Sequence, residues 1–151
     1  MKIIRNKIFE TNSSSTHSFT LCHHDIDFNL PRHIRPSWES EFGWNFETWK
    51  SAEEKLAYML RCFVSRDGVE YSNDEEKYLQ NVHNTLKPYQ ERLKTLGITF
   101  DLPTSYEWDD GYVDHGDEYA EDLQDFYDND EDLLRFLLNE ESYIEGGNDN
   151  V

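Results

Sequence analysis

Two short runs near the N-terminus have the residue pattern of β-strands. Residues 2–10 (KIIRNKIFE) and 16–22 (THSFTLC) are rich in β-branched and aromatic residues, and the polar run 12–15 separates them. This pattern predicts a strand, a turn and a second strand. Because side chains alternate along a strand, His17 would share a face with Phe19 and lie at the mouth of an apolar surface.

The middle of the chain carries apolar residues at helical spacing in two stretches. Residues 52–65 follow the capping-box sequence Ser51-Ala52-Glu53-Glu54, and a second box at residues 72–75 opens a longer stripe. We expect two amphipathic helices, the second capped at its C-terminus by Gly97. Pro88 should kink the second helix or divide it, because proline cannot donate the helical hydrogen bond.

The remaining segments are shorter. Residues 23–50 have no clear period, so they predict a long loop that packs through its aromatic residues. The final third predicts a strand, two short helices and a last strand, at residues 98–102, 117–127, 130–139 and 142–145. Asp130 would be the N-cap of the second of these helices. Together the elements predict an α+β fold in a single domain, with an N-terminal β-hairpin packed on amphipathic helices and an acidic, helical C-terminal third.

Charge is distributed very unevenly along the chain. Residues 101–151 hold eighteen acidic residues and one basic residue, Arg135, whereas residues 1–100 hold fourteen acidic and thirteen basic residues. Nearly all of the net charge of −18 therefore lies in the last third. Such a negative field attracts basic surfaces and repels nucleic acid, which makes direct DNA binding by this segment unfavourable.

Composition narrows the class of protein further. Aromatic residues make up 15% of the chain, enough to form a core although the hydrophobic content is only 36%. Cys22 and Cys62 are too few for a disulfide framework, and no apolar run is long enough for a signal peptide or a membrane span. We therefore expect a soluble, cytoplasmic protein with reduced thiols and no membrane partner.

The densest polar run lies in the turn between the two predicted strands. Glu10 precedes it, His17 closes it, and the residues between could hold a phosphate or another ligand through hydroxyl and backbone N–H donors: Asn12, Ser13, Ser14, Ser15 and Thr16. His17 would act as acid or base near neutral pH, with Glu10 orienting it. Asn and Ser are also ordinary turn residues, so a plain hairpin turn is the alternative.

The run ETNSSSTHS, from Glu10 to Ser18, resembles the signature of a family of small, poorly characterised proteins of Gram-positive bacteria and their phages. Many members also carry an Asp-His pair in the middle of the chain and an Asn-Asp pair near its end. Here these are Asp114-His115 and Asn148-Asp149. The resemblance implies a phage or mobile-element setting, but it does not point to any particular activity.

If the three matching segments meet in space, they would form a cluster of carboxylates and imidazoles. Glu10, His17 and His115 would then be catalytic groups of a phosphoester-cleaving enzyme, with RNA among its candidate substrates. Asp114 and Asp149 would be ligands if the reaction used a divalent metal, the one cofactor that the residue types suggest; a metal-free reaction through two histidines is equally open.

The acidic third offers a different function. Carboxylates about 5–6 Å apart on a helix face approach the spacing of phosphates along a nucleic-acid strand. This surface would comprise Glu107, Asp109, Asp110, Asp117, Glu118, Glu121, Asp122, Asp125, Asp128, Asp130, Glu131 and Asp132. Four aromatic residues interleave with it and could stack at an interface: Tyr106, Trp108, Tyr112 and Tyr119. The surface predicts a nucleic-acid mimic that inhibits a basic, nucleic-acid-handling enzyme, and the phage setting that the resemblance implies makes this a host enzyme of the defence type. A purely solubilising surface is the alternative.

Overall fold

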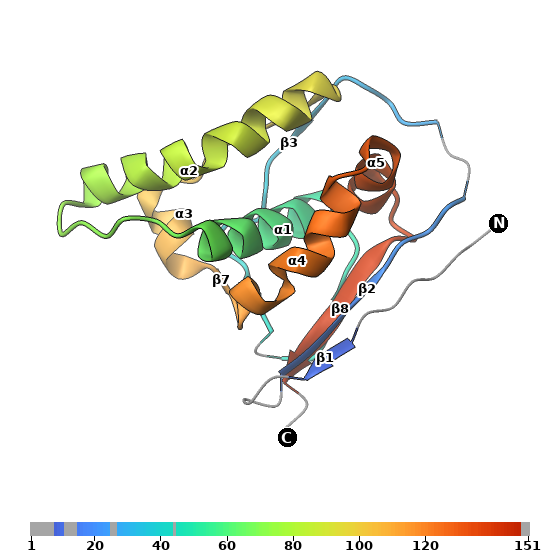
Figure 1. Ribbon diagram of the computed structural model, residues 1–151, viewed down its shortest axis with the longest axis horizontal. Coiled ribbons are helices and arrows are strands. Elements are labelled where there is room, and N and C mark those ends of the chain that lie inside the picture. The colour runs from blue at the N-terminus through green and yellow to red at the C-terminus, as the bar shows by residue number, and fades with distance from the viewer. Residues whose placement is uncertain (1–7, 11–14, 25–26, 44, 149–151) are drawn as a thin grey trace.

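The computed structural model describes residues 8–10, 15–24, 27–43 and 45–148 and has a mixed α+β fold (Figure 1). Within these ranges the helices are α1 (Ala52–Asp67), α2 (Glu75–Thr95), α3 (Ser105–Asp110), α4 (Gly116–Tyr127) and α5 (Asp130–Leu138). The strands are β1 (Ile8–Glu10), β2 (Ser15–Thr20), β3 (Arg32–Ile34), β4 (Glu41–Phe42), β5 (Glu47–Trp49), β6 (Ile98–Phe100), β7 (Tyr112–Val113) and β8 (Tyr143–Asn148).

The largest sheet joins the two ends of the described chain. Its strand order is β1-β2-β8-β5, and all of its pairs are antiparallel. The C-terminal strand β8 therefore lies between β2 and β5, with Phe19 opposite Ile144 in the register. Both side chains are buried, since they point from the sheet toward the helices.

Two further strand pairs lie outside this sheet. β3 pairs with β6 and β4 pairs with β7, both in parallel. The expectation of a long loop over residues 23–50 is therefore wrong in part, because that segment contains β3, β4 and β5. Strands of two or three residues are too short to show a period, and partners far along the chain define them.

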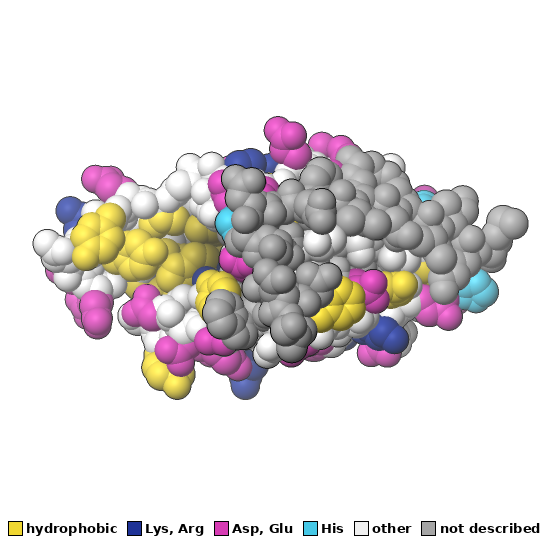
Figure 2. Space-filling model, turned by 90° about the horizontal axis from the view of Figure 1, so that it is seen from below, with side chains coloured by type: hydrophobic (Ala, Val, Ile, Leu, Met, Phe, Trp, Pro, Cys, Tyr) yellow, Lys and Arg dark blue, Asp and Glu magenta, His cyan; other side chains and the backbone are white. Residues whose placement is uncertain are grey.

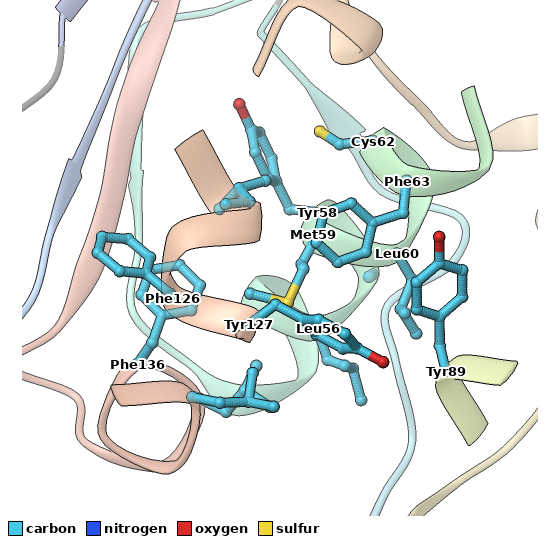
Figure 3. Close-up of a cluster of buried hydrophobic side chains, with 14 of the residues drawn as sticks. Leu56, Tyr58, Met59, Leu60, Cys62, Phe63, Tyr89, Phe126, Tyr127 and Phe136 are labelled. Atoms are coloured by element: carbon cyan, nitrogen blue, oxygen red, sulfur yellow. The ribbon is translucent and has the colours of Figure 1, made fainter. Parts of the chain in front are cut away.

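Helix α1 forms the centre of the molecule and packs against α2, α4 and α5. Figure 3 shows its side chains between Phe126 and Phe136 on one side and Tyr89 of α2 on the other. Most of the helix is buried from Ala52 to Val64. That burial includes Lys55, whose Nζ donates to the carbonyl oxygens of Asn139 (2.8 Å) and Ser142 (2.7 Å) and so ties α1 to the turn between α5 and β8.

The helix starts show which capping signals the chain uses. Ser51 caps α1 as expected, accepting from the Glu54 amide at 3.1 Å. The second predicted box is wrong: Asp74 caps α2, while Ser72 accepts from the Asp74 amide instead. Likewise Asn129, and not Asp130, caps α5. In both cases a neighbouring Asx side chain satisfies the free N–H groups of the first turn.

Helix α2 is continuous through Pro88, so of the two effects expected of this proline, a kink or a division, the division does not occur. Gly97 follows the end of α2 with φ of +87°, in the position that favours glycine, as the sequence predicts. Helix α3 was not expected, although Thr104 and Glu107 form a reciprocal capping box at its start. None of the helices in the described ranges combines the length and apolar character needed to cross a membrane.

Candidate functional site

His17 lies in the middle of the largest sheet. Its strand, β2, has β1 on one side and β8 on the other, and the register places His17 opposite Phe9 and Gly146. The side chain is 0% exposed, so it belongs to the core and not to the mouth of an apolar face as the alternation suggested. A buried histidine requires hydrogen-bond partners, since burial of an unsatisfied polar group is costly.

Aromatic side chains surround the imidazole. The ring of Tyr119 stacks on it with centroids 4.3 Å apart and planes at 3°, and the Tyr58 hydroxyl forms a short hydrogen bond with Nδ1. Trp49 contributes a tilted ring at 6.3 Å. These four residues, His17, Trp49, Tyr58 and Tyr119, form what we call the His17 cage. They come from β2, β5, α1 and α4, so the cage joins the sheet to two helices.

Burial sets the protonation state of the cage. Desolvation lowers the pKa of His17 to about 4, with Asp114 opposing this shift and His115 adding to it. Burial also raises the pKa of the Tyr58 hydroxyl, which therefore stays protonated and can donate to Nδ1. This arrangement assigns the single proton of the neutral ring to Nε2.

Nε2 faces a narrow space shared with Asp114. A Cβ added at Gly43 would lie 3.0 Å from Nε2 of His17 and 2.7 Å from Cβ of Asp114, so Gly43 fills the gap between the two side chains. Its φ of +108° also favours glycine. On the other flank of the ring, a Cβ at Gly146 would come within 2.9 Å of Cδ2 of His17. The imidazole position thus depends on two glycines that sequence reasoning did not identify.

Asp114 and His115 lie where β7 leads into α4. The Asp114 amide donates to the Phe42 carbonyl at 2.8 Å, which extends the pairing of β4 with β7. His115 is the residue before α4, with a left-handed φ of 55°. Its Nε2 is 3.7 Å from Oδ1 of Asp114 and its Nδ1 is 3.5 Å from Oε1 of Glu118. Both Asp114 and His115 are about one-third exposed, so this pair reaches solvent next to the buried His17.

The described residues on either side of residues 11–14 lie in β1 and β2, and β2 pairs with β8. Glu10 pairs with Thr16, and Ser15 lies opposite Asn148 in the β2–β8 register. Only the backbone of Glu10, Ser15 and Asn148 is described. Asn12, Ser13, Ser14 and Asp149 lie outside the described residues. Backbone pairing thus places Glu10 and Asn148 beside the N-terminal part of β2, while Asp114 and His17 both lie next to Gly43.

The candidate metal ligands do not form a site among the described residues. No group of three or more His, Cys, Asp or Glu side chains in these ranges could hold a metal ion together. Asp114 has His115 beside it and His17 nearby, whereas the other proposed ligand, Asp149, is not described.

The acidic third is folded, and most of the carboxylates predicted to form a binding surface are exposed. Asp122 is an exception at 6% exposure, so it does not belong to the surface. Tyr119 is also buried and stacks on His17, so it cannot stack at an interface, whereas Tyr106 is 73% exposed. Glu107 lies in the capping box of α3. Near α5, Asp130 pairs with Arg92 and Glu131 pairs with Arg135.

Helix α4 carries the densest part of the exposed charge. We call this set the acidic row: it comprises Asp117, Glu118, Glu121 and Asp125 of α4 and the C-cap residue Asp128, all of them exposed. At 3.6 residues per turn these positions fall within an arc of about 100° on the side of α4 opposite its buried residues. Helix geometry thus aligns five carboxylates from one end of α4 to the other.

No family model, curated protein or solved structure matches this chain. The geometry of the acidic row and of the His17 cage is therefore the basis for assigning a function.

Proposed function

We propose that the protein binds the nucleic-acid-binding surface of a basic enzyme through the acidic row and thereby inhibits that enzyme. The observation that carries the proposal is the alignment of five exposed carboxylates on one side of α4. The resemblance of residues 10–18 to a family of phage and Gram-positive proteins supports a defence enzyme of the host as the target.

Spacing supports mimicry of a nucleic-acid strand. From Asp117 to Asp128 the row spans about 17 Å at the rise of an α-helix. Each strand of a DNA duplex carries one phosphate per about 3.4 Å of helix axis, hence about five phosphates over the same axial length. A channel lined with Lys and Arg that accommodates such a strand would meet a similar linear charge density on α4.

The rigidity of α4 supports the same function. Its opposite side is anchored in the core by Ala120, Leu123 and Phe126, and Tyr119 packs on His17. Carboxylates on a fixed helix lose little conformational entropy on binding, whereas those on a flexible acidic tail would lose much more. The net charge of −18 would in addition increase the rate of encounter with a basic partner.

The test compares two triple variants that each remove three negative charges. Asp117→Asn, Glu121→Gln and Asp125→Asn together weaken the acidic row, whereas Glu75→Gln, Glu76→Gln and Glu91→Gln remove exposed charges from α2. Each protein is added to cleavage assays with purified bacterial nucleases: a restriction endonuclease, an exonuclease and an RNA-guided nuclease.

We expect inhibition of at least one nuclease by the unmodified chain and by the α2 variant. The α4 variant should inhibit about tenfold or more weakly, since each lost interfacial pair contributes up to about 1 kcal/mol. Equal losses from both triple variants would mean that only net charge matters. Inhibition that survives the α4 changes would contradict the proposal.

A second function, phosphoester cleavage, is favoured by one specific observation. The narrow space at Gly43 brings Nε2 of His17 close to Asp114, beside the solvent-facing His115. Because His17 is 0% exposed, catalysis by its ring would require the side chains packed around it, such as Tyr119, to move aside. The functions separate in one comparison: His17→Gln would abolish an enzymatic activity and spare inhibition, whereas the α4 triple variant would do the reverse.

A further inference from the structure

A cavity of about 280 Å³ lies between the C-terminal half of α1, α3, β7 and the first residue of α4, and no residue of the His17 cage lines it. Its walls include Val64 and Val113 together with the rings of Tyr78, Trp108 and Tyr112. Figure 2 shows hydrophobic side chains gathered around a hollow on the left of the molecule, where these elements meet. The walls combine the apolar side chains of Val64, Val69 and Val113 with polar residues, among them Arg61 and Ser65. Small-molecule sites likewise combine apolar walls with polar groups that orient the ligand.

Arg61 supplies a positive charge to this cavity. Its side chain lines the cavity although the residue is only 8% exposed, and its guanidinium lies over the Trp108 ring at 4.0 Å from the centroid. Burial lowers the pKa of Arg61 to about 10, so it remains charged at neutral pH. Among the described residues no carboxylate lies within 4.0 Å of it to form an ion pair; exposed Asp109 acts from farther away.

The hydrogen bonds of Arg61 are incomplete. Nη2 donates to three carbonyl oxygens, those of Trp38 (2.8 Å), Glu107 (3.2 Å) and Trp108 (2.8 Å). The Nε–H is buried and meets no acceptor in the part of the chain that the structure describes. Bonding of Nη2 to the last turn of α3 explains why Arg61 is held in place. It leaves unexplained why the buried Nε–H lacks an acceptor and why no carboxylate pairs with this charge beside the cavity.

The surrounding charge restricts what could complete the site. A net charge of −18 repels ligands with several negative charges, whereas a single cation can hold one carboxylate. A cavity of about 150 Å³ accepts benzene, so the volume here suits one ring or a fused pair of rings that also bears a carboxylate.

We propose that the Arg61 cavity binds a small aromatic monocarboxylate, whose ring lies against Trp108 and Tyr112 and whose carboxylate accepts from the Arg61 guanidinium. Trp108 and Tyr112 would stack with the ring and Arg61 would form a charge-assisted hydrogen bond with the carboxylate; the fold already holds all three side chains in position. This site is independent of the acidic row, and the proposal does not depend on the proposed inhibitory function.

The test uses four acids as probes, benzoate, 3-phenylpropionate, indole-3-acetate and 2-naphthoate, each paired with its primary amide. Titration of the full chain is followed by NMR at the amides of Val64 and Val113 and at the Arg61 Nε–H. The neutral amides test the role of charge without any change to Arg61. Ser65→Trp, at an exposed position of α1 that lines the cavity, fills the site, and Asn84→Trp on α2 is the matched control.

At least one acid should bind with a dissociation constant below about 5 mM and shift these three resonances together. Its amide should bind about tenfold more weakly, because hydrogen bonds to charged groups contribute more than neutral ones. Ser65→Trp should weaken binding by a similar factor, and Asn84→Trp should not change it. Absence of binding by all four acids, equal binding of acid and amide, or unchanged binding by Ser65→Trp would overturn the proposal.

Discussion

At the scale of single residues, His17 is a core group whose neutral form the fold requires. It accepts from Tyr58, stacks on Tyr119 and occupies space left by Gly43 and Gly146. Burial removes the ring from water and so disfavours its protonated form, and this desolvation explains the low pKa of His17. The environment of His17 thus makes the neutral imidazole part of the packed core.

This protonation state predicts a pH-dependent stability. The pKa of His17 is about 4 in the folded state and 6.5 in the unfolded state, so the unfolded chain binds more protons between these values. Stability contributed by the neutral ring is present above pH 6.5 and is lost as the pH falls toward 4, by about 3 kcal/mol in all. His17→Phe cannot be protonated, and it should be less stable at pH 7 by about 1–3 kcal/mol because Tyr58 loses its acceptor.

Urea denaturation of both proteins at pH 7, 5.5 and 4 measures this difference. The difference in free energy of unfolding between the unmodified chain and His17→Phe should decrease as the pH falls, because only the unmodified chain contains the titrating imidazole. A difference that stays constant across the range would show that His17 does not control the acid sensitivity.

Gly43 and Gly68 provide a second test at this scale, because both have a positive φ but only Gly43 has side chains packed against it. Gly43→Ala combines an unfavourable φ with a Cβ pressed between Asp114 and His17, so we expect a loss of about 3 kcal/mol or more. Gly68→Ala has a comparable φ of +82° but nothing within 4 Å of the new Cβ, and should cost about 1 kcal/mol. Equal losses in thermal denaturation would argue against close packing at Gly43.

At the scale of elements, local side chains decide where helices begin. Sequence spacing favours Asp130 as the cap of α5, but in the structure Asn129 accepts from the Asp132 amide at 3.0 Å while Asp130 pairs with Arg92. The residue before an expected cap can replace it whenever its side chain reaches the same N–H groups.

This assignment predicts different costs for two neighbouring substitutions. Asn129→Ala removes the cap and should destabilise the protein by about 1 kcal/mol. Asp130→Ala removes an exposed ion pair and a favourable dipole contact, for about 0.5 kcal/mol. Chemical denaturation of the two variants should therefore rank Asn129→Ala as the less stable; the reverse order would restore Asp130 as the cap.

At the scale of the whole molecule, the chain closes on itself by placing β8 between β2 and β5. This closure pairs residues 15–20 with residues 143–148, and α4 packs on α1 with its acidic side exposed. One fold thus positions both the His17 cage and the acidic row.

The sequence was sufficient for some of this architecture and insufficient for the rest. Long amphipathic segments such as α1 and α4 could be predicted because their apolar period extends over several turns. The pairs β3–β6 and β4–β7 could not, since each strand depends on a partner far away in the chain. For the same reason Tyr58 and Trp49 were missed as neighbours of His17, while the approach of Asp114 to His17 was only a hypothesis.

The most direct test of the central claim is competition for a single surface. Fluorescence anisotropy of a labelled oligonucleotide bound to the inhibited nuclease is followed as this protein is added, with the α4 and α2 triple variants in parallel. The account predicts that the protein displaces the oligonucleotide completely, that added salt weakens this displacement, and that the α4 variant needs about tenfold more protein than the α2 variant. A ternary complex, in which nuclease, oligonucleotide and this protein remain bound together, would contradict it.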